Sequence, residues 1–184
     1  MADLEPGALL VATPKLVDPN FFRTVVLMCS IDPAGAMGVV LNRPLDAVDL
    51  EGHLPGWAAV AMPPATFFQG GPVEPTAGIG VGIIGQDGPP ANFREFAPRL
   101  GLVDLSNEPE PARPLDGIRV FLGYAGWTAD QLEGEIAEGA WFVVDSLAED
   151  VTDADPETLW KRVLQRQAGK LAMFAHFPLD PRAN

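Results

Sequence analysis

The residues best suited to chemistry flank one hairpin-like stretch of the chain. Arg23 precedes its first apolar arm, and Asn42 and Arg43 follow its second arm. Guanidinium groups form charge-assisted hydrogen bonds with carboxylates and phosphates. Because the two outer ends of a tight hairpin are neighbours in space, these side chains predict a site for a small anion. The structural alternative is an ion pair between Arg23 and Asp18, with Asn42 capping a turn.

Two glycine-containing segments are expected to complete this site. In the first, two glycines and a proline force a sharp turn. The second leads from a strand into a helix, whose first N–H groups lack partners and suit an anion. The candidate ligand-binding residues are Arg23, Asn42, Arg43, Gly70, Gly71, Tyr124, Gly126, Trp127 and Gln131. The alternative is again structural, since the glycines serve tight turns, Trp127 the core and Gln131 a helix cap.

Other kinds of site find little support. The two histidines, His53 and His176, are far apart and neither has a second ligand at metal-site spacing, so we expect no metal and no cofactor. No serine lies in a G-x-S-x-G motif. Gly80, Gly82 and Gly85 match the dinucleotide fingerprint literally, but they lie inside an apolar run that no helix follows. They predict a glycine-rich strand instead.

The charge balance argues against nucleic acid as a partner. The 184 residues include 25 acidic and 12 basic ones, which gives a net charge of −13. Such a surface repels phosphate backbones and anionic lipid. One basic stripe, Arg162, Arg166 and Lys170, complements the dipole of the last helix, so we do not expect direct DNA binding. The acidic residues crowded between 120 and 160 predict a solvated face.

The chain is expected to be a cytoplasmic monomer. No apolar stretch approaches about 18 residues, and the first residues are acidic, which argues against a membrane span and a secretory signal. The single cysteine, Cys29, lies inside an apolar strand, where burial would raise the pKa of its thiol. A reducing compartment suits such a sequence. The length fits a single domain, 1–184, with a core at about 7–169 and a loose C-terminal tail.

The elements that must position the site centre on a hairpin at about 24–41. Its arms, 24–29 and 36–41, are continuous apolar runs rich in β-branched residues, which is typical of strands buried on both faces. Between them, Asp32-Pro33-Ala34-Gly35 is the sequence that a type I turn prefers. This pattern predicts the central hairpin of a sheet with other elements packed over it.

The remaining elements alternate irregularly. Further strands are expected at 7–12, 66–69, 78–85, 100–105, 118–123 and 141–144. Helical segments are expected at 57–61, at 93–96, after the N-cap Thr128 with Gln131 completing a capping box, and from Asp155 to about Gly169. Without a regular strand–helix rhythm, an α+β domain with a mixed sheet is favoured over a doubly wound fold.

Five motifs occur in a specific order: Asp18–Arg23, Gly35–Pro44, Gly70–Val73, Gly123–Trp127 and Gln131–Glu133. Together they resemble the YqgE/AlgH family of bacterial proteins, over about residues 7–169. The resemblance implies an α+β domain whose mixed, forked β-sheet curls into a pseudo-barrel with flanking helices. It also implies a cytosolic protein. It implies no reaction, because the family is described as of unknown function, with a transcriptional-regulator label taken from one branch.

The chain departs from the family pattern at two places. Many relatives carry Glu-His where this chain has Ser30-Ile31, and Pro-Gly where it has Ala129-Asp130. No catalytic set of residues is assembled, which favours a non-enzymatic regulatory or interaction domain acting through a protein partner or a small anionic ligand. The alternative is an enzyme acting on a small anionic metabolite in a cleft near Arg23, Arg43 and Tyr124.

Overall fold

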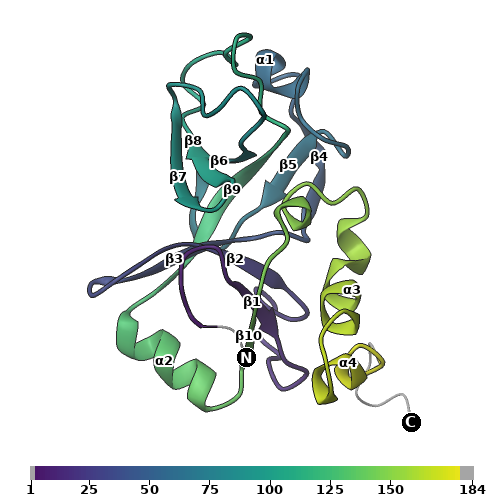
Figure 1. Cartoon of the computed structure of the whole chain (residues 1–184). Coiled ribbons are helices and arrows are strands. Elements are labelled where there is room, and N and C mark those ends of the chain that lie inside the picture. Colours follow the sequence, from purple (N-terminus) through teal and green to yellow (C-terminus); the bar gives the residue numbers. More distant parts are fainter. Residues whose placement is uncertain (1–2, 179–184) are drawn as a thin grey trace.

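A ten-stranded mixed sheet forms the centre of the molecule, and short helices lie around it (Figure 1). The computed structural model describes residues 3–178. The strands are β1 (Leu9–Ala12), β2 (Val25–Asp32), β3 (Gly35–Val40), β4 (Pro44–Asp49), β5 (Thr66–Gln69), β6 (Val73–Ile83), β7 (Phe93–Ala97), β8 (Leu100–Val103), β9 (Gly117–Trp127) and β10 (Trp141–Val144). The α-helices are α1 (Pro55–Ala58), α2 (Ala129–Ala137), α3 (Leu159–Gln165) and α4 (Lys170–Phe174).

The sheet forks along β9. The main strand order is β10-β1-β2-β3-β9-β6-β8-β7, and β5 branches from β9 with β4 beside it. Residues Val120–Leu122 of β9 pair in parallel with β5, whereas Ala125–Trp127 pair antiparallel with β3. Gly70 joins the two branches, because its N–H donates to the Leu122 carbonyl and its own carbonyl accepts from the Val40 N–H, both at 2.8 Å.

The sheet also curls on itself. The last strand of the order, β7, comes back against β2. It also approaches the residues before β1, where a Cβ on Gly7 would lie 2.5 Å from that of Ala97. The α+β class and the forked, curled sheet expected from the sequence are therefore confirmed.

The central hairpin, β2 and β3, is confirmed. In its turn, Asp32 Oδ1 accepts hydrogen bonds from the Ala34 N–H at 2.7 Å and the Gly35 N–H at 3.2 Å. Alternate side chains of β2 enter two different cores, so that Leu27 shares a core with α3 and Met28 shares one with α2. Figure 1 shows these helices on opposite sides of the sheet, with the hairpin tip projecting from the body. Burial on both faces explains the continuous apolar run.

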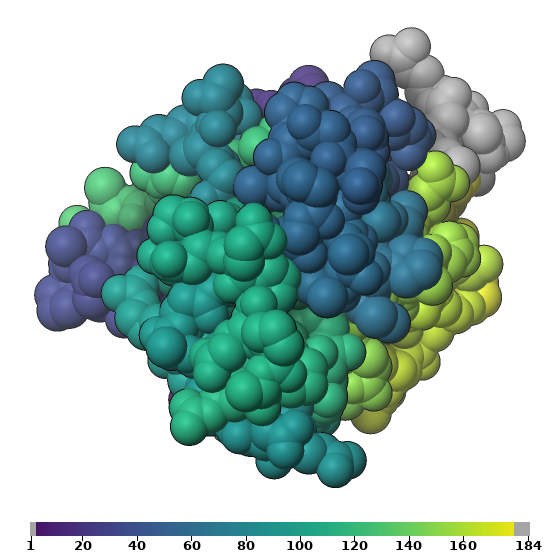
Figure 2. All heavy atoms as spheres, turned by 90° about the horizontal axis from the view of Figure 1, so that it is seen from above, coloured from purple at the N-terminus to yellow at the C-terminus, as the bar shows by residue number. Residues whose placement is uncertain are grey.

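The upper part of the molecule has smaller cores of its own. Trp57 of α1 packs with Val103 and Ile118, and a neighbouring core holds Phe67 and Val120. Seen from above, α1 and the loop that follows it lie beside the loop between β8 and β9, with the projecting hairpin tip at the left (Figure 2). The C-terminal helices lie at the opposite side.

Several local expectations are wrong. Residues 93–96, expected as a helical turn, belong to β7, because they pair with β8 and extend the sheet. Residues 124–127, expected as a loop, continue β9, since β3 supplies a pairing partner there. The short helix begins at Pro55 rather than at 57, because proline is favoured in the first helical turn. A strand that was not expected, β4, occupies 44–49.

The C-terminal helical region is divided into pieces. A 3-10 turn, Pro156–Thr158, leads into α3, and Gly169, with φ of 69°, separates α3 from α4. Residues 170–174, within the segment expected as a loose tail, are helical. The ring centroids of Phe174 and Phe142 lie 5.0 Å apart. Residues 179–184 of that tail lie outside the described part of the chain. None of the helices described within 3–178 has the length and apolar character needed to cross a bilayer.

Candidate functional site

Arg23 borders a cleft between the segment before β2 and the C-terminal residues. The cleft has a volume of about 490 Å³, within the range of small-molecule sites. We call it the Arg23 cleft. The residues that line it are Pro14, Phe22, Arg23, Met173, His176, Phe177 and Pro178. Most of these side chains are apolar. Arg23 and His176 are therefore the groups that give the cleft its polar character.

Arg23 is partly exposed, and its guanidinium lies over the Trp160 ring, 4.5 Å from the ring centroid. Its Nη2 donates to the main-chain carbonyls of Phe177 and Pro178, the latter at 2.7 Å. No ion pair to Arg23 occurs within residues 3–178, so the pairing with Asp18 that was the structural alternative is not made there. Partial burial lowers the pKa of Arg23 from its ordinary value.

The backbone of Arg23 is held in an uncommon conformation. Its φ is 53°, which non-glycine residues rarely adopt. Asn42, which follows the second arm of the hairpin, fixes this conformation. Its Nδ2 donates to the Arg23 carbonyl at 2.9 Å, and its Oδ1 accepts from the Val25 N–H at 2.9 Å. The capping role considered for Asn42 is thus the one that the structure displays.

Arg43 does not share the Arg23 cleft. Its Nη2 donates to the Phe22 carbonyl at 3.2 Å. Burial lowers the pKa of Arg43, and the nearby charge of Asp18 opposes that shift. With Gly71 and Gln69, Arg43 lines a depression that is too narrow to hold a water molecule. Arg23 and Arg43 therefore lie in different surroundings.

The candidate glycines lie at the fork of the sheet. A Cβ on Gly70 would lie 2.2 Å from the Gly123 carbonyl oxygen, and one on Gly71 would lie 2.2 Å from the Tyr124 carbonyl carbon. Gly126 borders the Tyr124 ring, which a Cβ would meet at 3.4 Å. Close backbone approach thus accounts for Gly70 and Gly71, and it brings Gly71 beside Tyr124 as expected.

Trp127 and Gln131 belong to a third place, at the start of α2. Glu135 Oε2 accepts from the indole N–H of Trp127 at 2.9 Å and of Trp141 at 2.8 Å, and Gln131 Nε2 donates to Glu135 Oε1 at 3.1 Å. Thr128 Oγ1 accepts from the Gln131 N–H at 3.2 Å, which confirms the N-cap. The second half of the predicted capping box, a hydrogen bond between the Gln131 side chain and the Thr128 N–H, is wrong, because the Gln131 side chain binds Glu135 instead.

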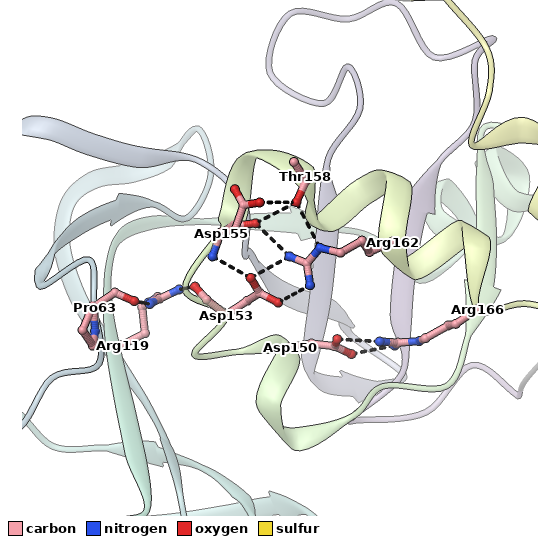
Figure 3. A network of polar contacts seen from close by, with 8 residues as sticks. All are labelled: Pro63, Arg119, Asp150, Asp153, Asp155, Thr158, Arg162 and Arg166. Carbon is pink, nitrogen blue, oxygen red and sulfur yellow. Dashed lines mark hydrogen bonds and ion pairs between the residues drawn. The ribbon is translucent and has the colours of Figure 1, made fainter.

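The basic stripe and the acidic run, treated separately in the sequence, meet in space (Figure 3). Both guanidinium Nη atoms of Arg162 bind the Asp153 carboxylate, at 2.6 and 2.7 Å. Arg166 binds Asp150 in the same two-pronged way, with both distances 2.6 Å. Asp150 is 3% exposed, so the solvated face expected for this run does not extend to it. These arginines are committed to carboxylates and are not a phosphate-binding surface.

Sequence reasoning missed the C-terminal lining of the Arg23 cleft. His176, in the segment expected to be a loose tail, lines the same cleft as Met173 and Arg23. The available signal was the apolar spacing of Met173 and Phe177, four residues apart, which favours one shared face when the segment is helical. Glu135 was missed too, although two tryptophans that need an acceptor pointed to such a residue.

Comparison with known proteins places this architecture in a family. A family model described as AlgH-like matches residues 9–172. The chain belongs to the AlgH-like family. A UPF0301 protein of Streptomyces avermitilis is 50% identical over 97% of this chain and 94% of its own length. Another, from Mycobacteroides abscessus, is 42% identical over 98% of this chain and 88% of its own length. The family resemblance of the sequence motifs is confirmed.

Solved structures of the AlgH-like family have the same fold. The crystal structure of a Corynebacterium diphtheriae protein matches with a TM-score of 0.89 at 33% identity, covering 96% of this chain and 94% of that one. The solution structure of the AlgH protein of Pseudomonas aeruginosa matches with a TM-score of 0.67 at 26% identity, covering 97% of each chain. Family and fold are thereby established, and the activity must be argued from the chemistry of the site.

Proposed function

We propose that this AlgH-like protein is a non-enzymatic regulatory domain that binds a small organic carboxylate in the Arg23 cleft. One observation carries the proposal: the guanidinium of Arg23 borders a mostly apolar cleft and has no acidic partner among residues 3–178. Most lysines and arginines among residues 3–178 form no ion pair, and what singles out Arg23 is its place in the lining of this cleft. In a chain with a net charge of −13, it supplies a local attraction for an anion.

A carboxylate with an apolar body suits this lining. Arg23 now donates to neutral main-chain carbonyls, whereas its hydrogen bonds to a carboxylate would be charged on both sides and stronger. Phe22 and Met173 offer apolar contact for the rest of the ligand. One guanidinium matches the single charge of a carboxylate.

The enzymatic alternative has less support in this cleft. Among its lining residues, His176 is the one side chain suited to general acid–base chemistry, and no serine, cysteine or lysine accompanies it. Binding therefore explains the cleft better than turnover. Regulation through direct DNA contact stays outside the proposal, because Arg162 and Arg166 already bind carboxylates.

The proposal is tested with hexanoate and its uncharged counterpart hexanol as probes. Calorimetric titration of the full chain should give binding of hexanoate in clear preference to hexanol. Arg23→Gln should weaken hexanoate binding by about tenfold or more, since it removes a charge-assisted hydrogen bond. Arg94→Gln, at an exposed arginine of β7, is the matched control and should bind like wild type.

Any of three results would overturn the proposal. The first is equal affinity for hexanoate and hexanol, and the second is no binding of hexanoate by any variant. The third is an Arg23→Gln protein that binds hexanoate as well as wild type does. Thermal unfolding of each variant beside wild type confirms that the proteins compared are folded.

A further inference from the structure

We infer that residues 176–178 are a built-in competitor for Arg23, so that a carboxylate entering the Arg23 cleft releases this segment. The inference rests on the proposed function, because it needs a ligand in that cleft. It adds a mode of regulation: the state of the C-terminal segment would report whether the cleft is occupied.

The competition follows from the hydrogen bonds of one atom. Arg23 Nη2 donates to the carbonyl oxygens of both Phe177 and Pro178. A carboxylate that takes the same nitrogen has to displace these two acceptors. The exchange is favourable in kind, because a charged acceptor replaces neutral ones. The docked segment and a carboxylate bound to Nη2 are therefore mutually exclusive at this nitrogen.

The segment is weakly attached beyond Arg23, which makes release feasible. The residue before it, Ala175, is 4% exposed and belongs to the main core. Phe177, by contrast, is 48% exposed and stacks on the Phe174 ring at 5.5 Å between centroids. His176 and Pro178 are exposed as well. Release can thus begin after Ala175 and leave α4 packed in place.

This arrangement has a quantitative consequence for binding. When a site is open for only a fraction of the time, the apparent dissociation constant equals the intrinsic constant divided by that fraction. Weakening the docked state should therefore tighten carboxylate binding. A plain wall residue would have the opposite effect, because losing its contact with the ligand weakens binding.

Phe177→Ala distinguishes the two roles in the full-length chain. It removes the stacking on Phe174, and we expect it to tighten hexanoate binding several-fold, by up to about tenfold. Val60→Ala, at an exposed apolar residue of the upper part, is the control and should not change the affinity. Hydrogen exchange provides a second measurement: hexanoate should speed exchange of the His176 and Phe177 amides, which bond to the carbonyls of Met173 and Phe174.

Each outcome separates the inference from the proposed function. Weaker or unchanged hexanoate binding by Phe177→Ala overturns the competitor role while leaving a carboxylate site at Arg23 intact. Binding by wild type with unchanged or slower exchange at His176 and Phe177 does the same. Failure of both wild type and Phe177→Ala to bind hexanoate removes the proposed function and the inference with it. Binding by Phe177→Ala alone supports a segment that closes the cleft.

Discussion

At the scale of single residues, Arg23 shows how an uncommon backbone conformation is held in place. A non-glycine residue at positive φ costs on the order of 1–3 kcal/mol and persists where its surroundings enforce it. Here the amide of Asn42 enforces it, by binding the Arg23 carbonyl and the neighbouring Val25 N–H. The sequence predicted Arg23 and Asn42 as partners across the hairpin. It could not predict that the guanidinium reaches Phe177, because 154 residues separate the two.

Cys29 gives a prediction at the same scale. Its side chain is 2% exposed, and burial raises the pKa of the thiol to about 12. Because the thiolate is the reactive form, we expect the folded protein to resist Ellman's reagent at pH 8. In concentrated guanidinium chloride, the single thiol of the chain should react at once. Immediate reaction of the folded protein would contradict this burial.

At the scale of elements, the C-terminal helices are tied to the acidic loop that precedes them. Arg162 of α3 holds Asp153, whose own carbonyl accepts from Arg119 Nη1 at 2.8 Å. Arg119 is 1% exposed, donates to the Pro63 carbonyl at 2.9 Å and stacks on Phe68 (Figure 3 shows the polar contacts). The loop after β10 thus connects α3 to the upper part of the sheet through two arginines.

The Asp153 contact predicts a pH dependence of stability. Burial raises the pKa of Asp153, but hydrogen bonds from the Arg162 side chain and the Asp155 N–H, together with the charges of Arg162 and Arg119, lower it by more. The pKa therefore lies below its ordinary value of 3.8. The unfolded chain then binds more protons than the folded one, and the contact stabilises above about pH 4 and is lost as the pH falls further. Asp153→Asn should lower the free energy of unfolding by about 1 kcal/mol at pH 7.

Urea denaturation at pH 7 and near pH 2.5 checks this prediction. The difference between Asp153→Asn and wild type should shrink at the lower pH, because the wild-type carboxyl becomes protonated there. Glu133→Gln, at an exposed residue of α2, should show no such difference at either pH. A stability difference that is independent of pH would mean that the charge of Asp153 is not what matters.

The elements differ in how far the sequence revealed them. The β2–β3 hairpin was predictable because burial on both faces leaves a continuous apolar run, and 66–69 was predicted with its observed bounds. Residues 93–96 misled because so short a segment takes its conformation from the strand that it pairs with. The Arg23 cleft was half predictable: the arginine stood out, but its C-terminal wall depends on how α3 and α4 fold back against the sheet.

At the scale of the whole molecule, the fork along β9 decides the architecture. One edge of this strand pairs first with β5 and then with β3. Its other edge pairs with β6 over almost its whole length. The change of partner takes place at Gly123, whose φ is 72°. A Cβ at this position would lie 2.5 Å from the Gly71 carbonyl oxygen and 2.9 Å from that of Val73. Both the backbone conformation and the close approach therefore require glycine.

Gly123→Ala should accordingly lower the free energy of unfolding by about 2–4 kcal/mol, because strain at positive φ adds to the clash with the backbone of Gly71. The matched control lies in α2: a Cβ on Gly134 meets nothing within 4 Å, and Gly134→Ala should raise the free energy of unfolding by about 0.5–1 kcal/mol. Urea denaturation of both variants measures the two effects. The opposite signs matter, since they distinguish a glycine that the fork requires from one that the helix merely tolerates. A Gly123→Ala protein as stable as wild type would mean that the branches can meet without this close approach.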